Sequence, residues 1–203
     1  VYLGADILQP EVSAAVKRHG WRRVDDVDPV KRACALLLGD QPVGICSGRS
    51  EVGPRALGHR SILANPASAD SWAAVNRLKR REPWRPFAPA VLQSESATYF
   101  DRGPAVSRYM LFNYRSRTLA LPAVTHFDHT SRLQHVGSET GLLYDLLLAM
   151  TAVGAPGVLL NTSFNGPGVP IVETADDAFA EATKLGLGYI LTDFGLFAGP
   201  EAP

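Results

Sequence analysis

Cysteine is scarce in this chain of 203 residues, which contains only Cys34 and Cys46. Cys34 falls in a helical pattern and Cys46 in a strand pattern, and no C-x-x-C spacing connects them. Such a pair is typical of small buried hydrophobic side chains in a reducing compartment, and it disfavours a disulfide or a cysteine nucleophile.

The chain also lacks an excess of either charge, because 20 Lys and Arg residues balance 20 Asp and Glu residues. The whole molecule therefore has no field that would attract nucleic acid or an acidic membrane, and any electrostatic function must be local. No apolar run approaches the ~20 residues of a membrane-spanning helix, and the N-terminus shows no basic segment followed by an apolar core. We therefore expect a cytoplasmic protein without a membrane partner, and we disfavour nucleic acid as a partner.

Several motifs of nucleotide sites and hydrolases are missing. The sequence has no G-x-x-x-x-G-K-[ST], which excludes a P-loop, and no G-x-S-x-G elbow of a serine hydrolase. Asp193-Phe194-Gly195 matches a kinase tripeptide, but no glycine-rich loop or catalytic-loop motif accompanies it. We interpret this tripeptide as a turn between two strands.

Helix and strand signals alternate along the chain, and its length fits one domain, residues 1–203. Helical spacing of apolar residues, with capping residues or prolines at the ends, predicts helices over residues 10–20, 28–39, 68–81, 141–153 and 174–186. Thr174 and Asp177 resemble a capping box at the start of the last helix. Short apolar runs predict strands over residues 43–46, 88–92, 157–160, 189–191 and 196–197. This alternation predicts an α/β or mixed α+β domain with three layers.

The stretch from residue 93 to residue 121 has the least regular pattern and is rich in aromatic residues. Aromatic side chains at such spacings are more often part of a core than a platform for stacking bases. We therefore predict that the core includes Tyr99, Phe100, Tyr109, Phe112 and Tyr114.

Glycines, hydroxyl groups and three arginines are concentrated between Gly48 and Ile62, directly after the apolar run Val43 to Cys46. Glycine lets a backbone approach a ligand closely, and arginine forks match the paired oxygens of phosphate. This stretch therefore predicts a phosphate or carboxylate site at the end of a strand.

Basic residues also cluster around the predicted end of the helix over 68–81, where they are Arg77, Lys79, Arg80, Arg81 and Arg85. Pro83 and Pro86 cannot continue a helix, so Lys79 falls in the last helical turn and Arg85 in an extended segment. Two cations on either side of a helix end can converge on one ligand from different directions.

A polar turn, Asn161-Thr162-Ser163-Phe164-Asn165, follows the predicted strand over 157–160. Its hydroxyl and amide groups can bind the oxygens and amides of a nucleotide or of a carbamoyl group. The alternative is an Asx or Ser/Thr turn that bonds only its own backbone. The residues alone leave both interpretations open.

Four residues of metal-binding type occur close together, namely His126, Asp128, His129 and His135. The flanking residues 123–125 suggest an extended segment, in which two histidines three residues apart point to opposite faces. We therefore expect no metal site in this chain.

Three segments, residues 48–62, 76–89 and 159–165, resemble in their order the C-terminal domain of the O-carbamoyltransferases of antibiotic and nodulation-factor biosynthesis. The resemblance runs from about Tyr2 to about Gly195. It implies a YrdC-like fold, which is a three-layer domain with a twisted mixed sheet flanked by helices. Val52, His129 and Val169 depart from the family's usual Phe, Gly and Glu, which leaves the acceptor open.

The resemblance also implies roles for individual residues. Arg55 matches the family's G-P-R-A-L-G loop, Lys79 and Arg85 match its K-x-R-E-x-x-R-P-F segment, and Arg132 lies in a segment similar to D-G-S-A-R-x-Q. In the family these basic groups bind ATP and carbamoyl-adenylate, while a serine and an asparagine equivalent to Ser163 and Asn165 contact the nucleotide and its carbamoyl group. The implied nucleotide site comprises Arg55, Lys79, Arg85, Arg132, Asn161, Ser163 and Asn165. The implied catalytic residues among them are Lys79, Arg85, Ser163 and Asn165.

The family transfers a carbamoyl group from carbamoyl phosphate to a small-molecule hydroxyl acceptor. The resemblance implies that this domain makes carbamoyl-adenylate from ATP and carbamate, with Mg²⁺ accompanying the nucleotide. We expect its partner, in cis or in trans, to be an N-terminal actin-like, Kae1-like domain that lies outside this chain and holds the family's metal and acceptor site. One alternative is a non-catalytic nucleotide- or RNA-binding module, which the balanced charge disfavours. Another is a structural subunit without affinity for ATP.

Overall fold

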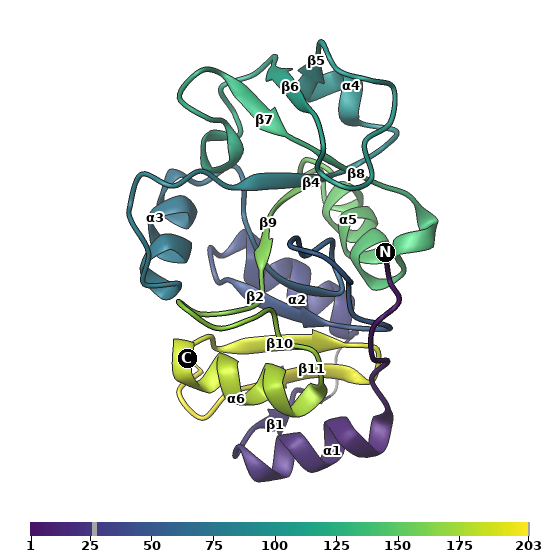
Figure 1. The fold of residues 1–203 in the computed structure, drawn as a ribbon, viewed down its shortest axis with the longest axis vertical. Coiled ribbons are helices and arrows are strands. Elements are labelled where there is room, and N and C mark those ends of the chain that lie inside the picture. Colours follow the sequence, from purple (N-terminus) through teal and green to yellow (C-terminus); the bar gives the residue numbers. More distant parts are fainter. Residues whose placement is uncertain (26–27, 203) are drawn as a thin grey trace.

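The computed structural model describes residues 1–25 and 28–202, and its central element is an eight-stranded mixed sheet (Figure 1). The strand order is β1-β11-β10-β2-β3-β9-β4-β8. The pairs β2–β10 and β4–β8 are parallel, and the other neighbours are antiparallel. The strands are β1 (Arg22–Arg23), β2 (Val43–Cys46), β3 (Arg60–Ala64), β4 (Ala88–Leu92), β8 (Gln134–Val136), β9 (Val158–Ser163), β10 (Tyr189–Thr192) and β11 (Gly195–Ala198).

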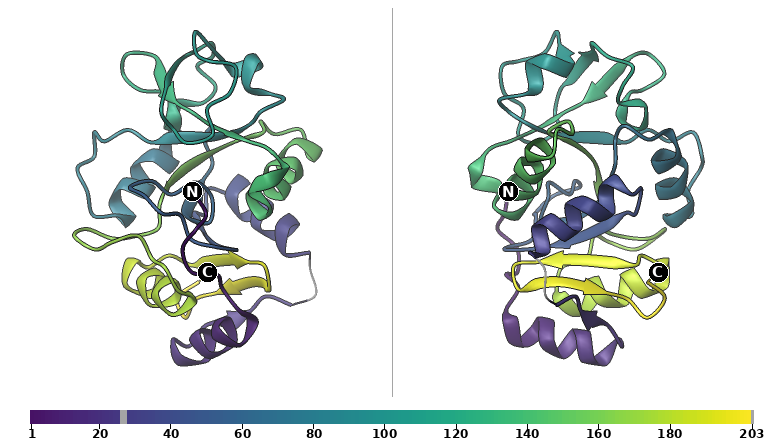
Figure 2. Two further views of the ribbon diagram at one scale, coloured as in Figure 1. Left: turned by 45° about the vertical axis from the view of Figure 1, so that its right-hand side comes forward. Right: turned by 180° about the vertical axis from the view of Figure 1, so that it is seen from behind.

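Helices cover both faces of this sheet (Figure 2). On one face α1 (Gln9–Arg18) packs beside α6 (Ala175–Leu185), and on the other α2 (Pro29–Leu38) packs beside α5 (Leu142–Ala152). Successive strand residues point to opposite faces, so Ile62 joins the core under α1 and α6 while Leu63 joins the core under α2 and α5. This arrangement confirms the predicted three-layer α/β domain.

A small antiparallel sheet lies beyond β4 and β8, at the top of Figure 1. It contains β5 (Phe100–Asp101), β6 (Asn113–Ser116) and β7 (Thr130–Arg132). The shorter elements around it are α4 (Ser96–Tyr99), η1 (Pro122–Val124) and η2 (Ser138–Thr140), while α3 (Ala69–Leu78) packs against η1. The stretch whose pattern was least regular therefore contains β5, β6 and α4, joined by loops.

The prediction of aromatic core residues is confirmed for Phe100 and Tyr114 but is wrong for Tyr109 and Phe112, which are 46% and 49% exposed. Met110 takes the inward position between them, at 3% exposure and with a φ of 53°. The chain bends at this residue, and the side chains of Tyr109, Leu111 and Phe112 are exposed.

Two local predictions are also wrong. The helix expected over 68–81 is α3 and ends at Leu78, because Arg80 has a φ of 48°, which a right-handed helix excludes. Residues 123–125 were expected to be extended, but Pro122 begins the 3₁₀ helix η1. A proline is favourable in the first turn of a helix because it lacks only an N–H that would be unpaired there.

Other local predictions are confirmed. Asp193 and Phe194 form the turn between β10 and β11, and Thr174 caps α6 reciprocally with Asp177. Cys34 and Cys46 are buried and free, and burial raises the pKa of both thiols. Among residues 1–25 and 28–202, no helix has the length and apolar character needed to cross a membrane.

Candidate functional site

The loop between β2 and β3 is held in shape by the carboxylate of Glu51. Its Oε1 accepts hydrogen bonds from the backbone N–H groups of Leu57, His59 and Arg60, at 2.6, 2.9 and 3.3 Å. Three charge-assisted hydrogen bonds to one carboxylate fix the path of the loop. The tip of this closed loop carries Arg55, which lines a cavity.

Two of the three arginines in this stretch are structural. Arg60 is fully buried, and its guanidinium donates to five backbone carbonyls, those of Ala5, Ser47, Gly48, His59 and Glu173. Arg49 donates to the carbonyls of Leu3 and Gly4, at 2.7 and 3.0 Å. The prediction of an anion site in this stretch therefore rests on Arg55.

A cavity of about 340 Å³ lies between this loop and the ends of β7 and β9. Basic and polar side chains line much of it, and among its lining residues none carries a carboxylate. Burial, together with the charge of Arg55, lowers the pKa of Arg132. The polar residues that line this cavity are Arg55, Arg81, Arg85, Arg132, Asn161, Thr162 and Ser163.

Lys79 lies directly after α3 and is only 6% exposed. Its Nζ donates to the backbone oxygen and the Oγ of Ser163, the latter at 3.3 Å, and to the backbone oxygen and Oδ1 of Asn165, at 2.9 and 3.0 Å. These contacts connect the end of α3 to the turn after β9. Burial, together with the charges of Arg81 and Arg85, lowers the pKa of Lys79 to about 7.

A second cavity, of about 330 Å³, is lined by Lys79 and Asn165 and shares Arg81, Arg85 and Ser163 with the first. Ser163 and Asn165 also bond each other, through Oγ and Oδ1 at 2.6 Å. Asn165 Nδ2 donates to the carbonyl of Val169, at 2.8 Å. The turn thus makes local bonds, as one interpretation held, and it also presents Ser163 to both cavities.

Arg81 is a candidate site residue that the sequence reasoning left out. Its Nε donates to Asn76 Oδ1 at 2.6 Å, and its guanidinium lies 4.0 Å from the centre of the Phe87 ring. Burial, followed by the charge of Arg85, lowers the pKa of Arg81 to about 10. The signal for this residue was its place in the K-x-R spacing after Lys79, but the four other cations nearby made it indistinguishable from a solvated surface charge.

Arg85 and Arg80 lie at the outer edge of the site. Arg85 has 56% of its side chain exposed and lies 3.6 Å from the carboxylate of Glu82, so an anionic ligand must compete with this partner. Arg80 lines the second cavity, and its guanidinium reaches the carbonyl of Lys184 at 3.4 Å.

Asn161 is buried, at 2% exposure, and its amide joins three segments. Its Nδ2 donates to Gln134 Oε1 at 2.8 Å, while Gln134 Nε2 donates to the carbonyl of Leu57 at 2.6 Å. Within the described part of the chain, Asn161 Oδ1 and Arg132 Nε are buried without a hydrogen-bond partner. Asn161 and Arg132 therefore each bring a buried unpaired polar group to the first cavity, beside its other arginines, which fits a ligand that carries both phosphate and N–H groups.

His126 and His135 have structural partners. His135 Nδ1 accepts from the backbone N–H of Ser107 at 2.7 Å, which places the ring proton on Nε2, 2.6 Å from Ser96 Oγ. The ring is therefore a donor to Ser96 and not a base that could activate it. Across residues 1–25 and 28–202, His, Cys, Asp and Glu form no group of three suited to a metal ion.

Comparison with known proteins gives three findings. The family model described as "Carbamoyltransferase C-terminus" matches residues 34–197. The nodulation protein NolO of Bradyrhizobium diazoefficiens is 35% identical over 98% of this chain and 37% of its own length. The 3'-hydroxymethylcephem-O-carbamoyltransferase of Amycolatopsis lactamdurans is 40% identical over 65% of this chain and 26% of its own length.

The fold also matches a solved structure, that of HypF from T. kodakarensis, with a TM-score of 0.58. The match covers 78% of this chain and 20% of that one, at 23% sequence identity. It confirms the predicted YrdC-like fold. The chain spans 37% of NolO, so most of that relative has no counterpart in these residues.

Proposed function

The chain belongs to the carbamoyltransferase C-terminus family, and from this premise we propose that it catalyses the ATP-dependent formation of carbamoyl-adenylate from carbamate. This half-reaction is part of the transfer of a carbamoyl group from carbamoyl phosphate to a hydroxyl acceptor. In it, a carbamate oxygen bonds to the α-phosphorus of ATP, the bond from that phosphorus to the bridging oxygen breaks, and pyrophosphate leaves.

The observation that carries the proposal is the convergence of cations on two adjoining cavities. Arg55, Arg81, Arg85 and Arg132 line one, and Lys79 joins Arg81 and Arg85 in the other. Glu82 is the single carboxylate among the lining residues of the two cavities. Such a site attracts polyphosphate and stabilises the negative charge that develops on pyrophosphate as it leaves.

Three polar groups orient the other end of the ligand. Ser163 lines both cavities, and Asn161 and Arg132, whose Oδ1 and Nε are buried without a partner, line the first. An amide presents one C=O and one N–H₂, so it satisfies an acceptor and a donor at once. Mg²⁺ enters with the nucleotide phosphates, because the lining offers it only the Glu82 carboxylate.

The remaining steps belong to a partner. We infer that an actin-like, Kae1-like domain, joined in cis or bound in trans, supplies carbamate from carbamoyl phosphate and holds the acceptor. The 37% coverage of NolO is consistent with such a division.

Calorimetry with Mg·ATP tests the first step, with Lys79→Ala as the matched variant. We expect saturable binding that the variant weakens. Phosphorus NMR then tests chemistry, because pyrophosphate should appear when the chain is mixed with its partner domain, carbamoyl phosphate and ATP. No binding of ATP at millimolar concentration would support a structural subunit, and tighter binding of RNA than of ATP would support a nucleic-acid module.

A further inference from the structure

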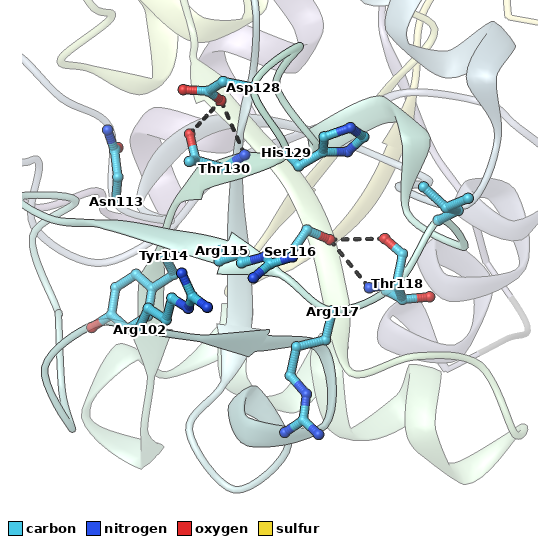
Figure 3. Close-up of a pocket in the computed structure, with 11 residues that line it drawn as sticks. Arg102, Asn113, Tyr114, Arg115, Ser116, Arg117, Thr118, Asp128, His129 and Thr130 are labelled. Atoms are coloured by element: carbon cyan, nitrogen blue, oxygen red, sulfur yellow. Dashed lines mark hydrogen bonds between the residues drawn. The ribbon is translucent and has the colours of Figure 1, made fainter.

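A separate cavity lies on the small sheet and shares no lining residue with the two cavities above (Figure 3). Its volume is about 690 Å³, roughly twice that of the cavity beside Arg55. β6 and the segments that flank β5 and β7 form its walls. Small-molecule sites commonly have volumes of about 300 to 1,000 Å³, so its size alone admits an organic ligand.

Three arginines line this cavity: Arg102, Arg115 and Arg117. In the described part of the chain, none of these three arginines forms an ion pair with a carboxylate, for which the N–O distance would be at most 4.0 Å. Arg115 gives the strongest evidence, because Asp101 lies directly opposite it in the β5–β6 pair and the two residues form no ion pair. An arginine that does not bond a neighbouring carboxylate has its N–H donors available for a ligand.

The one carboxylate in the lining is already engaged. Asp128 Oδ1 accepts from the backbone N–H and the Oγ1 of Thr130, at 3.0 and 2.7 Å, as the dashed lines in Figure 3 show. These bonds orient the carboxylate toward its own turn. The lining therefore has three arginines against one carboxylate. Even with the Asp101 carboxylate opposite Arg115 included, positive charge is in local excess in a chain of zero net charge.

The cavity also has a fixed cation and an apolar wall. Arg117 Nη1 donates to the carbonyl of Ala97 at 2.9 Å, which holds one edge of its guanidinium and leaves the other donors free. Tyr114 and Leu119 line the cavity as well, and Leu119 is 81% exposed. Arginine forks select phosphate oxygens, while an exposed apolar side chain favours an organic body.

From this geometry we propose that the small sheet carries a second binding site, which takes a small phosphorylated organic molecule through Arg102, Arg115 and Arg117. This site is independent of the carbamoyl-adenylate chemistry proposed above. A nucleic acid is the less favoured ligand. Its binding normally requires a broad basic surface, whereas these three arginines line one cavity.

Amide NMR of the chain during a pyrophosphate titration tests the proposal, because it reports the two anion sites separately. We expect shifts at residues 113–118 and 128–130 in addition to those at residues 161–165. The double variant Arg102→Gln with Arg115→Gln should weaken binding at the small sheet by about tenfold to a hundredfold, the effect of lost charge-assisted bonds. Shifts at residues 161–165 should be unchanged.

Arg108→Gln is the matched control, since Arg108 is exposed, pairs with Glu139 at 2.7 Å and is not in the lining. It should leave both sets of shifts unchanged. If the Gln double variant fails to fold, the Lys double variant at the same positions keeps the charge but not the forks, and it should still weaken binding at the small sheet.

Three outcomes would overturn the proposal. One is the absence of shifts at residues 113–118 while those at 161–165 move. Another is Lys double-variant binding equal to the native chain, which would show that charge alone is recognised. The third is a short RNA that shifts the same amides at lower concentration than pyrophosphate, because the site would then be a nucleic-acid contact.

Discussion

Lys79 combines burial with four hydrogen-bond acceptors, and this makes it sensitive to pH in the neutral range. Its pKa is lowered to about 7 by burial and by its arginine neighbours. The amine is therefore charged below this pH and increasingly neutral above it. A bound phosphate favours the ammonium form, so ligand binding should raise the pKa of Lys79 and take up a proton at pH values above about 7.

We accordingly predict that ATP affinity falls as the pH rises from 6.5 to 8.5. Calorimetry in buffers of different ionisation enthalpy should detect proton uptake at the upper end of this range. Lys79→Met removes the titrating group and should remove the proton uptake. Equal affinity at both ends of the range would show that Lys79 does not titrate in the site.

Single substitutions of the cations should distinguish the contribution of the inner site to ATP binding from that of its edge. Lys79→Ala and Arg85→Ala should each weaken ATP binding by about 1.5 to 3 kcal/mol, the range for hydrogen bonds to charged groups. The loss for Arg85→Ala should fall at the lower end of this range, because ligand binding must displace the contact of Arg85 with Glu82. Arg85→Lys should restore only part of the loss, since an ammonium cannot form a bidentate fork.

Arg80→Ala serves as the control for this series, because Arg80 has a left-handed backbone and its guanidinium points to Lys184. It should change ATP affinity little. An effect as large as that of Lys79→Ala would mean that the whole patch acts as a diffuse basic surface.

At the scale of elements, the loop between β2 and β3 depends on Arg60. This side chain joins the loop to Ala5 near the N-terminus and to Glu173 before α6. Arg60→Ala leaves several buried carbonyls unpaired, and each unsatisfied buried polar group costs about 1 to 3 kcal/mol. We therefore predict that the free energy of unfolding falls by about 3 kcal/mol or more.

Urea unfolding measures this change, with Arg49→Ala as the matched control. Arg49 also donates to two carbonyls, but it is exposed, so water can replace its bonds. Its loss should cost under about 1 kcal/mol. A comparable loss in both variants would contradict the assignment of Arg60 as the loop's buried anchor.

At the scale of the whole molecule, the chain matches only part of the length of its relatives. It spans 37% of NolO and 26% of the cephem O-carbamoyltransferase. A reaction that uses an acceptor, carbamoyl phosphate and ATP needs sites for all three, and the cavities around Lys79 and Arg55 suit the nucleotide.

We therefore predict that the purified chain alone transfers no carbamoyl group from carbamoyl phosphate to a hydroxyl acceptor. Mass spectrometry of an acceptor incubated with the chain, ATP and carbamoyl phosphate measures this directly. Addition of the partner domain should produce the carbamoylated acceptor. Product formation without the partner would contradict the division of labour proposed here.

The sequence by itself determined the layers and the order of the motifs. Apolar residues at helical or strand spacing indicate which segments are helices and strands, because burial of one face depends on that spacing alone. The capping pair Thr174 and Asp177 and the buried cysteines were predictable for the same reason, since their surroundings follow from near neighbours in the chain. The candidate cations at Lys79 and Arg85 were visible because prolines place a helix end between them.

Only the tertiary structure decided which polar groups remain free to bind a ligand. Arg49, Arg55 and Arg60 lie in one short stretch, and the sequence does not distinguish their roles. In the structure the guanidinium of Arg60 donates to carbonyls of residues as distant as Ala5 and Glu173. Asn161 is held by Gln134, and Arg81 is held over Phe87 by Asn76. A hydrogen bond depends on the positions of two atoms in space, and those positions are set by segments that meet only when the sheet has formed.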